Sequence, residues 1–121
     1  MEIVITNNPM VRDKISATSR MSIEYYDTDY LGILKIARDR IHLGHSILTH
    51  PLSGSLKPGE TPYKTLVISS DIGILDEKSL SLIEESIIVC KKFEKIDRSR
   101  QSEDILNDFK LIDYDLVFSK L

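Results

Sequence analysis

The sequence predicts a single α/β domain, a layered sandwich in which helices flank a short, open and mainly parallel β-sheet. Two observations lead to this prediction. Short runs rich in β-branched residues alternate along the chain with longer segments whose apolar residues recur at helical spacing. The chain has 121 residues, 41% of them hydrophobic, which suits one domain with its own core over residues 1–121. A Rossmann-like or flavodoxin-like topology fits this alternation.

The N-terminal residues are expected to form a strand and then a short helix. Glu2–Thr6 is rich in β-branched residues, which favours a strand. Asn7 and Asn8 follow it as a turn. Pro9 suits the first position of a helix over residues 10–16, because that position needs no backbone N–H.

The next two elements are a strand and a longer helix. Apolar residues alternate over Arg20–Tyr26, which predicts a half-buried strand. From Tyr30 the apolar residues recur at helical spacing, after candidate N-caps at Asp27–Asp29. Gly44 suits the left-handed conformation that commonly follows the end of a helix. Gly32, inside the first turns, indicates close packing there.

The second half of the chain is expected to contain two more strands and two more helices. In order, these are a short strand over Ser46–Thr49, a buried strand within Tyr63–Ser70, a helix from Asp76 to about Ile96, and a helix that begins after a cap at Ser102. The final helix is expected to turn its apolar residues inward, namely Ile105, Leu106, Phe109 and Ile112. The segment Leu116–Phe118 fits either a last strand or a continuation of that helix.

Charge and cysteine content exclude several classes of protein. The formal net charge is −3, whereas a general nucleic-acid-binding protein would show a basic excess. A single Cys excludes an internal disulfide framework and most thiolate metal sites. The N-terminus lacks the features of a signal peptide, and no apolar run approaches the ~18 residues that span a bilayer. We therefore expect a cytoplasmic protein without nucleic-acid or membrane partners and without a cofactor.

The candidate functional residues gather between His42 and Lys64. This segment holds all three histidines and continues into a long loop rich in proline, and long loops in small domains are usually functional or disordered. Three imidazoles are enough to begin a zinc site. However, Gly44 is expected to end the helix between His42 and His45, which separates these two side chains. The sequence therefore favours helix-terminal and turn roles for the histidines, and no metal site is predicted.

A small anion is the ligand that this segment suits best. In parallel α/β sheets, ligands bind at the carboxyl ends of the strands, where polar residues accumulate here. A Ser-Gly-Ser turn presents N–H groups and hydroxyls to an oxyanion, and lysines and histidines add positive charge. The candidate ligand-binding residues are Asn7, Asn8, His45, Thr49, His50, Ser53, Gly54, Ser55, Lys57, Thr61 and Lys64. A turn whose serines bond their own backbone explains the loop equally well.

A hydrolytic site is weakly indicated in the same loop. Ser53 or Ser55 would serve as nucleophile, His50 as base and Glu60 as its orienting partner. These residue types are too common for their spacing to be diagnostic, and the chain has no Gly-x-Ser-x-Gly motif. Cys90 falls on the apolar face of a predicted helix, which favours a buried and inert thiol. The sequence therefore favours binding over catalysis.

Two stretches resemble the GrdX family. They are Ile3–Pro9, with the sequence IVITNNP, and the block His42–Lys64, with the pattern HxGHxxxTHPLxGSxKPxETPYK. Members of this family are small proteins encoded with the glycine, sarcosine and betaine reductase systems of amino-acid-fermenting anaerobic bacteria. The resemblance covers most of the chain up to about Phe93. It implies an accessory protein with components of these reductase systems as partners, and it supplies no catalytic residues.

Two functions remain open at this point. The first is an accessory protein that binds a partner protein or a small anionic ligand through the His42–Lys64 loop. The alternative is a small enzyme that acts on a carboxylate or acyl-phosphate compound at the same loop. A homodimer that covers exposed apolar surface is a further prediction for a chain of this length.

Overall fold

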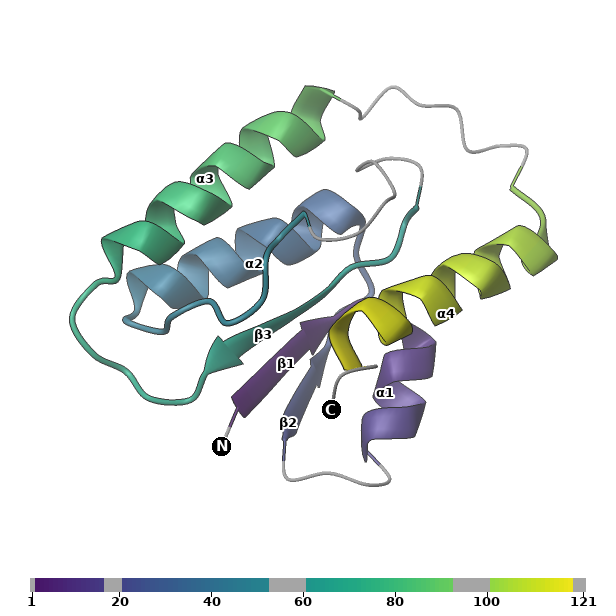
Figure 1. The fold of residues 1–121 in the computed structure, drawn as a ribbon, viewed down its shortest axis with the longest axis horizontal. Coiled ribbons are helices and arrows are strands. Elements are labelled where there is room, and N and C mark those ends of the chain that lie inside the picture. Colours follow the sequence, from purple (N-terminus) through teal and green to yellow (C-terminus); the bar gives the residue numbers. More distant parts are fainter. Residues whose placement is uncertain (1, 17–20, 53–60, 93–100, 119–121) are drawn as a thin grey trace.

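A computed structural model describes residues 2–16, 21–52, 61–92 and 101–118. Within these residues the chain forms strands and helices in an alternating order (Figure 1). They are β1 (Glu2–Thr6), α1 (Pro9–Ser16), β2 (Ser22–Tyr25), α2 (Tyr30–His42), β3 (Thr65–Ser69), α3 (Glu77–Lys92) and α4 (Glu103–Phe118). The predicted α/β class and all of these elements are confirmed, and Leu116–Phe118 continues the final helix. The predicted end of the preceding helix, near Ile96, lies outside the described residues.

The described strands form an open sheet in the order β2-β1-β3. β1 and β2 are parallel, as expected for two strands joined by a crossover helix. β3 is antiparallel to β1, with Glu2 opposite Ser69 and Thr6 opposite Thr65. The sheet is therefore mixed, and the expectation of a mainly parallel sheet is wrong for β3.

The segment after α2 explains the direction of β3. Ile47 forms an isolated antiparallel bridge with Ile68, so this segment runs along the outer edge of β3 in the direction of β1. It returns the chain to the carboxyl end of β1, and β3 must then run back. The predicted strand at Ser46–Thr49 is reduced to this bridge. One reason is that the Thr49 hydroxyl, and not a carbonyl, accepts from the Val67 N–H at 3.1 Å.

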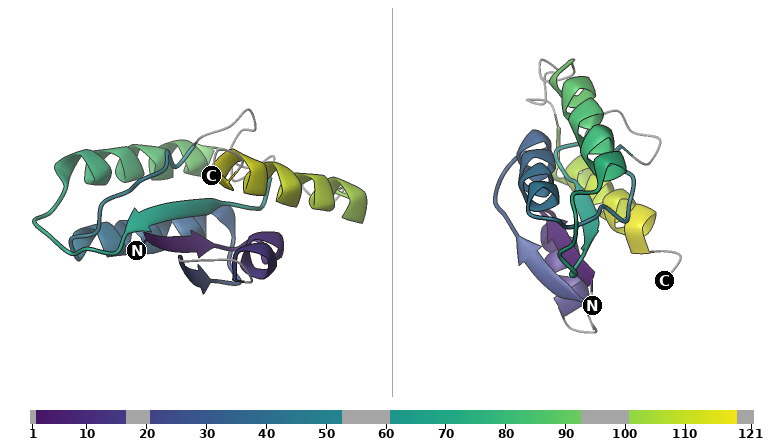
Figure 2. Two further views of the ribbon diagram at one scale, coloured as in Figure 1. Left: turned by 60° about the horizontal axis from the view of Figure 1, so that its bottom comes forward. Right: turned by 90° about the vertical axis from the view of Figure 1, so that its left-hand side faces the viewer.

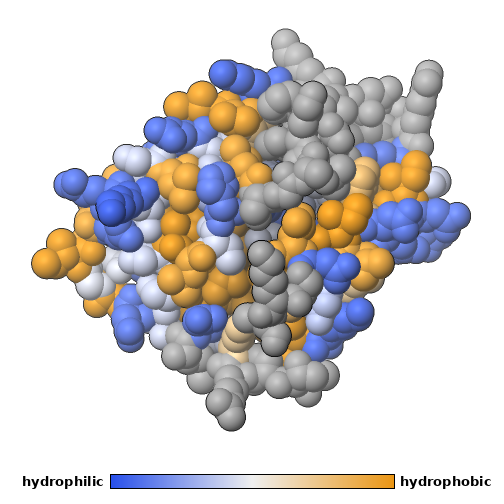
Figure 3. Space-filling model, viewed as in Figure 1, coloured by the Kyte–Doolittle hydropathy of each residue, from blue (hydrophilic) through white to orange (hydrophobic). Residues whose placement is uncertain are grey.

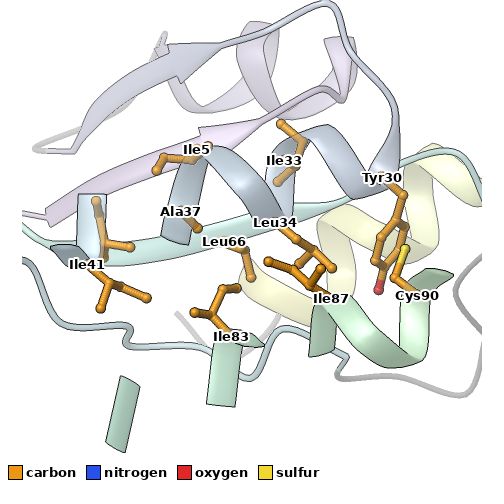
Figure 4. Close-up of a cluster of buried hydrophobic side chains, with 11 residues drawn as sticks. Ile5, Tyr30, Ile33, Leu34, Ala37, Ile41, Leu66, Ile83, Ile87 and Cys90 are labelled. Carbon is orange, nitrogen blue, oxygen red and sulfur yellow. The ribbon is translucent and has the colours of Figure 1, made fainter. Parts of the chain in front are cut away.

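Helices cover both faces of the sheet (Figure 2). In the right-hand view β3 lies between α2 and α4. One core joins β1 and β3 to α2 and α3, through Ile5, Ile33, Leu34, Ala37, Ile41, Leu66, Ile68, Ile83, Ile87 and Cys90 (Figure 4). A second core joins the other face to α1 and α4, through Val4, Val11, Ile15, Val67 and Phe118. Neighbouring residues of β1 and β3 enter opposite cores because successive strand side chains point to opposite faces.

The ends of α2 follow their local signals. The Asp29 carboxylate accepts from the Gly32 N–H at 2.7 Å and caps the N-terminus. Gly44 has φ +111°, and the N–H groups of Gly44 and His45 bond the carbonyls of Ile41 and Arg40. These two bonds form a Schellman motif, so the predicted left-handed residue is confirmed.

Replacing Gly44 by alanine is expected to destabilise the fold by about 3 kcal/mol, since a side chain at this φ is strained. The added Cβ would also lie 2.4 Å from the Gly73 carbonyl oxygen. Urea unfolding followed by circular dichroism measures the loss. Gly73→Ala is the matched control, because a Cβ there meets no atom within 4 Å. Equal stability of the two variants would contradict the packing of Gly44 against this loop.

The inward face of α4 differs from the prediction. Ile105 and Ile112 are 42% and 36% exposed, whereas Asp113 and Phe118 are buried. The helix contacts α1 and β3 mainly through its C-terminal half, around Tyr114, Val117 and Phe118. Ile105 and Ile112 therefore lie on the solvent side of the helix, whereas Leu106 and Phe109 are half-buried. Figure 3 shows apolar surface on the face that carries α4.

None of the helices within the described ranges is both long enough and apolar enough to cross a lipid bilayer.

Candidate functional site

The antiparallel pairing brings the end of β1 beside the start of β3, and with them two of the predicted site segments. The Asn7 side-chain amide donates to the carbonyls of Thr28 and Pro62 at 2.9 and 2.8 Å. Its oxygen accepts from the Lys64 N–H at 2.8 Å. Asn7 thus holds three chain segments together, and its side chain is fully used by these bonds.

Asn8 connects the same turn to α4. Its side-chain oxygen accepts from the Met10 N–H at 3.0 Å and so caps α1. Its amide donates to the Lys110 carbonyl at 2.9 Å and to the Asp113 carboxylate at 3.0 Å. Both asparagines lie where the sequence places them, but they build the site rather than face a ligand.

Asp113 is the centre of a buried hydrogen-bond network. The Thr65 backbone N–H and hydroxyl donate to the two carboxylate oxygens at 3.1 and 2.6 Å, and Asn8 supplies a third donor. Because the Thr65 hydroxyl gives its only proton to Asp113, the Thr6 hydroxyl is the donor in the 2.7 Å bond between the two threonines. Burial raises the pKa of Asp113, and the donors from Thr65 and Asn8 oppose this rise.

Lys64 is the buried cation of the site. The residue is 3% exposed, and its ammonium lies 5.7 Å from the centre of the Tyr30 ring. Within the described ranges, this ammonium makes no hydrogen bond or ion pair. Desolvation by burial lowers the pKa of Lys64 to about 8, although the negative charge of Asp113 acts in the opposite direction. Burial also raises the pKa of Tyr30, which stays neutral and donates to the Pro51 carbonyl at 3.2 Å.

A small pocket opens beside Lys64. Its volume of about 20 Å³ admits a group the size of about one or two water molecules. The lining residues are Tyr30, Thr61, Tyr63, Lys64, Phe109, Ile112, Asp113 and Leu116. Since Ile112 and Leu116 are exposed, the pocket reaches the surface of the protein.

Two donors line this pocket without an acceptor among the described residues. The buried side chains that the structure describes leave no enclosed nitrogen or oxygen without a partner, so the Lys64 ammonium keeps contact with solvent. The Thr61 hydroxyl accepts from the Tyr63 N–H at 3.2 Å, which leaves its own proton for another acceptor. The arrangement offers one cation and one hydroxyl proton to a ligand.

The histidines do not join this site. β3 runs opposite to β1, so the end of β3 lies at the far edge of the sheet, where the His45 Nδ1 is 2.6 Å from the Ser69 carbonyl oxygen. His45 therefore lies apart from Lys64 and its pocket. Thr49 lies on the outer edge of β3, and its hydroxyl accepts a hydrogen bond from the Val67 N–H. Among the described residues, no three His, Cys, Asp or Glu side chains gather as a metal site would require.

His50 lies within the described residues, whereas residues 53–60 of the loop that follows it do not. The His50 Nδ1 accepts from the Leu52 N–H at 3.0 Å, as a turn histidine does. Four predicted site residues, and with them the hydrolytic hypothesis, lie outside the described residues: Ser53, Gly54, Ser55 and Lys57.

Sequence reasoning missed Asp113 and Tyr30. A signal for Asp113 was present, because it falls four residues after Phe109 on the apolar side of the final helix. An acidic residue at such a position requires a buried partner. Tyr30 carried no comparable signal, since an aromatic residue in the first turn of a helix is ordinarily part of the core.

A comparison with protein families shows which family the chain belongs to. A family model described as GrdX-like protein matches residues 3–121. The chain belongs to the GrdX-like protein family. The match extends past residue 93 and includes α4, which supplies Asp113 to the site. The family places this GrdX-like chain among accessory proteins of the glycine reductase type. No curated protein and no solved structure matches the chain.

Proposed function

We propose that this GrdX-like accessory protein binds a small anion, preferably a carboxylate, in the pocket beside Lys64. The observation that carries the proposal is the buried ammonium of Lys64, which has no hydrogen bond or ion pair within the described residues. A buried lysine without a direct counter-ion is costly to the fold. Perturbed titratable groups of this kind concentrate at functional sites.

Asp113 offsets part of this cost but leaves the ammonium available. The structure gives no direct ion pair between Asp113 and Lys64, since Thr65 and Asn8 occupy the carboxylate oxygens. The pKa of Lys64 nevertheless stays lowered, so the attraction of Asp113 does not compensate for burial. A second anion within hydrogen-bond distance of the ammonium would complete the compensation.

The pocket favours a carboxylate among small anions. The Lys64 ammonium and the Thr61 hydroxyl are two donors for its two oxygens. Phe109 and Leu116 provide apolar wall for a short hydrocarbon part. Phosphate and acyl phosphates share the oxyanion chemistry, but each brings more oxygens than these two donors can bond. Association with components of the reductase systems remains a prediction from the family.

Thermal unfolding with acetate tests this proposal. At pH 7 and constant ionic strength, acetate is expected to raise the Tm in a saturable manner, by the equivalent of about 2.7 kcal/mol at one hundred times Kd. Acetamide, which has the same shape without the charge, is expected to leave the Tm unchanged. Inorganic phosphate serves as the larger anion in the same assay.

Variants separate the pocket from the loop. Lys64→Met is expected to abolish the acetate effect, whereas Lys35→Met, at an exposed position on α2, retains it. His50→Ala is also expected to retain it, since the His50 ring bonds its own turn. An unchanged Tm of the unmodified protein with every anion would overturn the proposal, and so would an equal increase in Lys64→Met.

A further inference from the structure

Lys64 has properties that anion binding alone does not require. An exposed lysine binds an anion without losing its hydration, whereas Lys64 is 3% exposed and lies against the ring of Tyr30. No hydrogen-bond acceptor among the described residues holds its protons. With a pKa of about 8, roughly one molecule in ten carries the neutral amine at pH 7. A neutral amine in a solvent-connected pocket is a nucleophile.

We propose that the Lys64 amine condenses with the carbonyl carbon of a small α-oxo acid bound in this pocket and forms an imine. This inference rests on the proposed anion site and names the class of ligand. In an α-oxo acid the carboxylate and the carbonyl carbon are bonded neighbours. A carboxylate attracted by the ammonium therefore brings its carbonyl carbon next to the same nitrogen.

The atoms and charges of this step balance. The ammonium loses a proton to water, and Nζ attacks the carbonyl carbon to give a carbinolamine. The former carbonyl oxygen then takes up a proton and leaves as water while the C=N bond forms. The product is a protonated imine, so the site carries the same positive charge before and after the condensation.

The surroundings of Lys64 suit each stage of this reaction. The Asp113 carboxyl group is oriented by the donors from Thr65 and Asn8, and the attraction by which it raises the pKa of Lys64 acts in the same way on a cationic imine. Thr61 lines the pocket with a hydroxyl proton that has no acceptor among the described residues. It is placed to donate to the oxygen of the carbonyl or of the carbinolamine. Phe109, Ile112 and Leu116 give the imine an apolar wall on one side of the pocket.

Reductive trapping tests the inference on the full chain. The protein is incubated at pH 7 with glyoxylate, the smallest α-oxo acid, and sodium cyanoborohydride, which reduces an imine to a stable secondary amine. Peptide mass spectrometry then gives the rate at each lysine. We expect Lys64 to be labelled at least about tenfold faster than exposed Lys35, because a larger fraction of its amine is neutral. Acetate is expected to slow the labelling of Lys64 and leave Lys35 unaffected.

The outcomes separate this inference from the anion site. If acetate raises the Tm but Lys64 is labelled no faster than Lys35, the imine is excluded and anion binding stands. If neither effect occurs, both proposals fail. Lys64→Arg keeps the positive charge without a nucleophilic amine, so it is expected to retain part of the acetate effect and to give no adduct at position 64. Fast labelling of Lys64 that acetate does not slow would show an amine reactive outside the anion pocket and would also overturn the inference.

Discussion

The Asp113→Ala protein is expected to be less stable than the unmodified protein by about 3–5 kcal/mol. The change removes the acceptor of three buried donors, namely the Thr65 N–H, the Thr65 hydroxyl and one of the two N–H groups of the Asn8 side-chain amide. Each unsatisfied buried group costs about 1–3 kcal/mol. Lys64 also loses the negative charge that partly offsets its burial. Urea unfolding followed by circular dichroism measures the difference.

The control for this prediction lies on the same helix. Asp115→Ala removes an exposed carboxylate from α4 and is expected to change stability by no more than about 0.5 kcal/mol. Hydrogen exchange adds a local readout, since loss of Asp113 is expected to reduce amide protection in α4 before β1 and β3. If the two variants unfold at the same urea concentration, Asp113 does not attach α4 to the sheet.

Lys64→Met is expected to act in the opposite direction and to stabilise the protein by about 3 kcal/mol at pH 7. The pKa of Lys64 is about 8 in the folded protein against 10.5 for an ordinary lysine, and each pKa unit corresponds to about 1.4 kcal/mol. The folded state binds the proton less tightly than the unfolded state. The charge of Lys64 therefore destabilises the fold fully below pH 8, and this cost disappears as the pH rises toward 10.5.

The pH dependence identifies the responsible group. The stability difference between Lys64→Met and the unmodified protein is expected to be largest below pH 8 and to shrink between pH 8 and 10.5. Lys35→Met is the control for lysine removal and is expected to show no such trend. A destabilised Lys64→Met protein would contradict the prediction, because it would mean that Asp113 more than compensates for the burial of the ammonium. A gain in stability together with lost acetate binding is the pattern of a functional site.

Residue patterns alone predicted some of the residues of the candidate site and not others. Asn7 and Asn8 are predicted as polar residues at the end of a strand and Lys64 as a positive group of the loop, and the three do lie together. His45 is predicted as a second positive or donor group, but it lies beside Ser69, at the opposite end of the sheet. The reasoning assumed that all strands share one direction. β3 runs in the opposite direction to β1, so its carboxyl end lies at the other end of the sheet.

Much of the fold could be predicted from the sequence because it depends on local interactions. The strand at Glu2–Thr6, the helix start at Asp29 and the left-handed Gly44 each depend on residues within a few positions of one another. Only the tertiary structure decided the direction of β3, because that direction depends on the bridge between Ile47 and Ile68. It also decided that Lys64 is buried and that Asp113 lies beside it, since no local pattern determines which surface a distant helix covers.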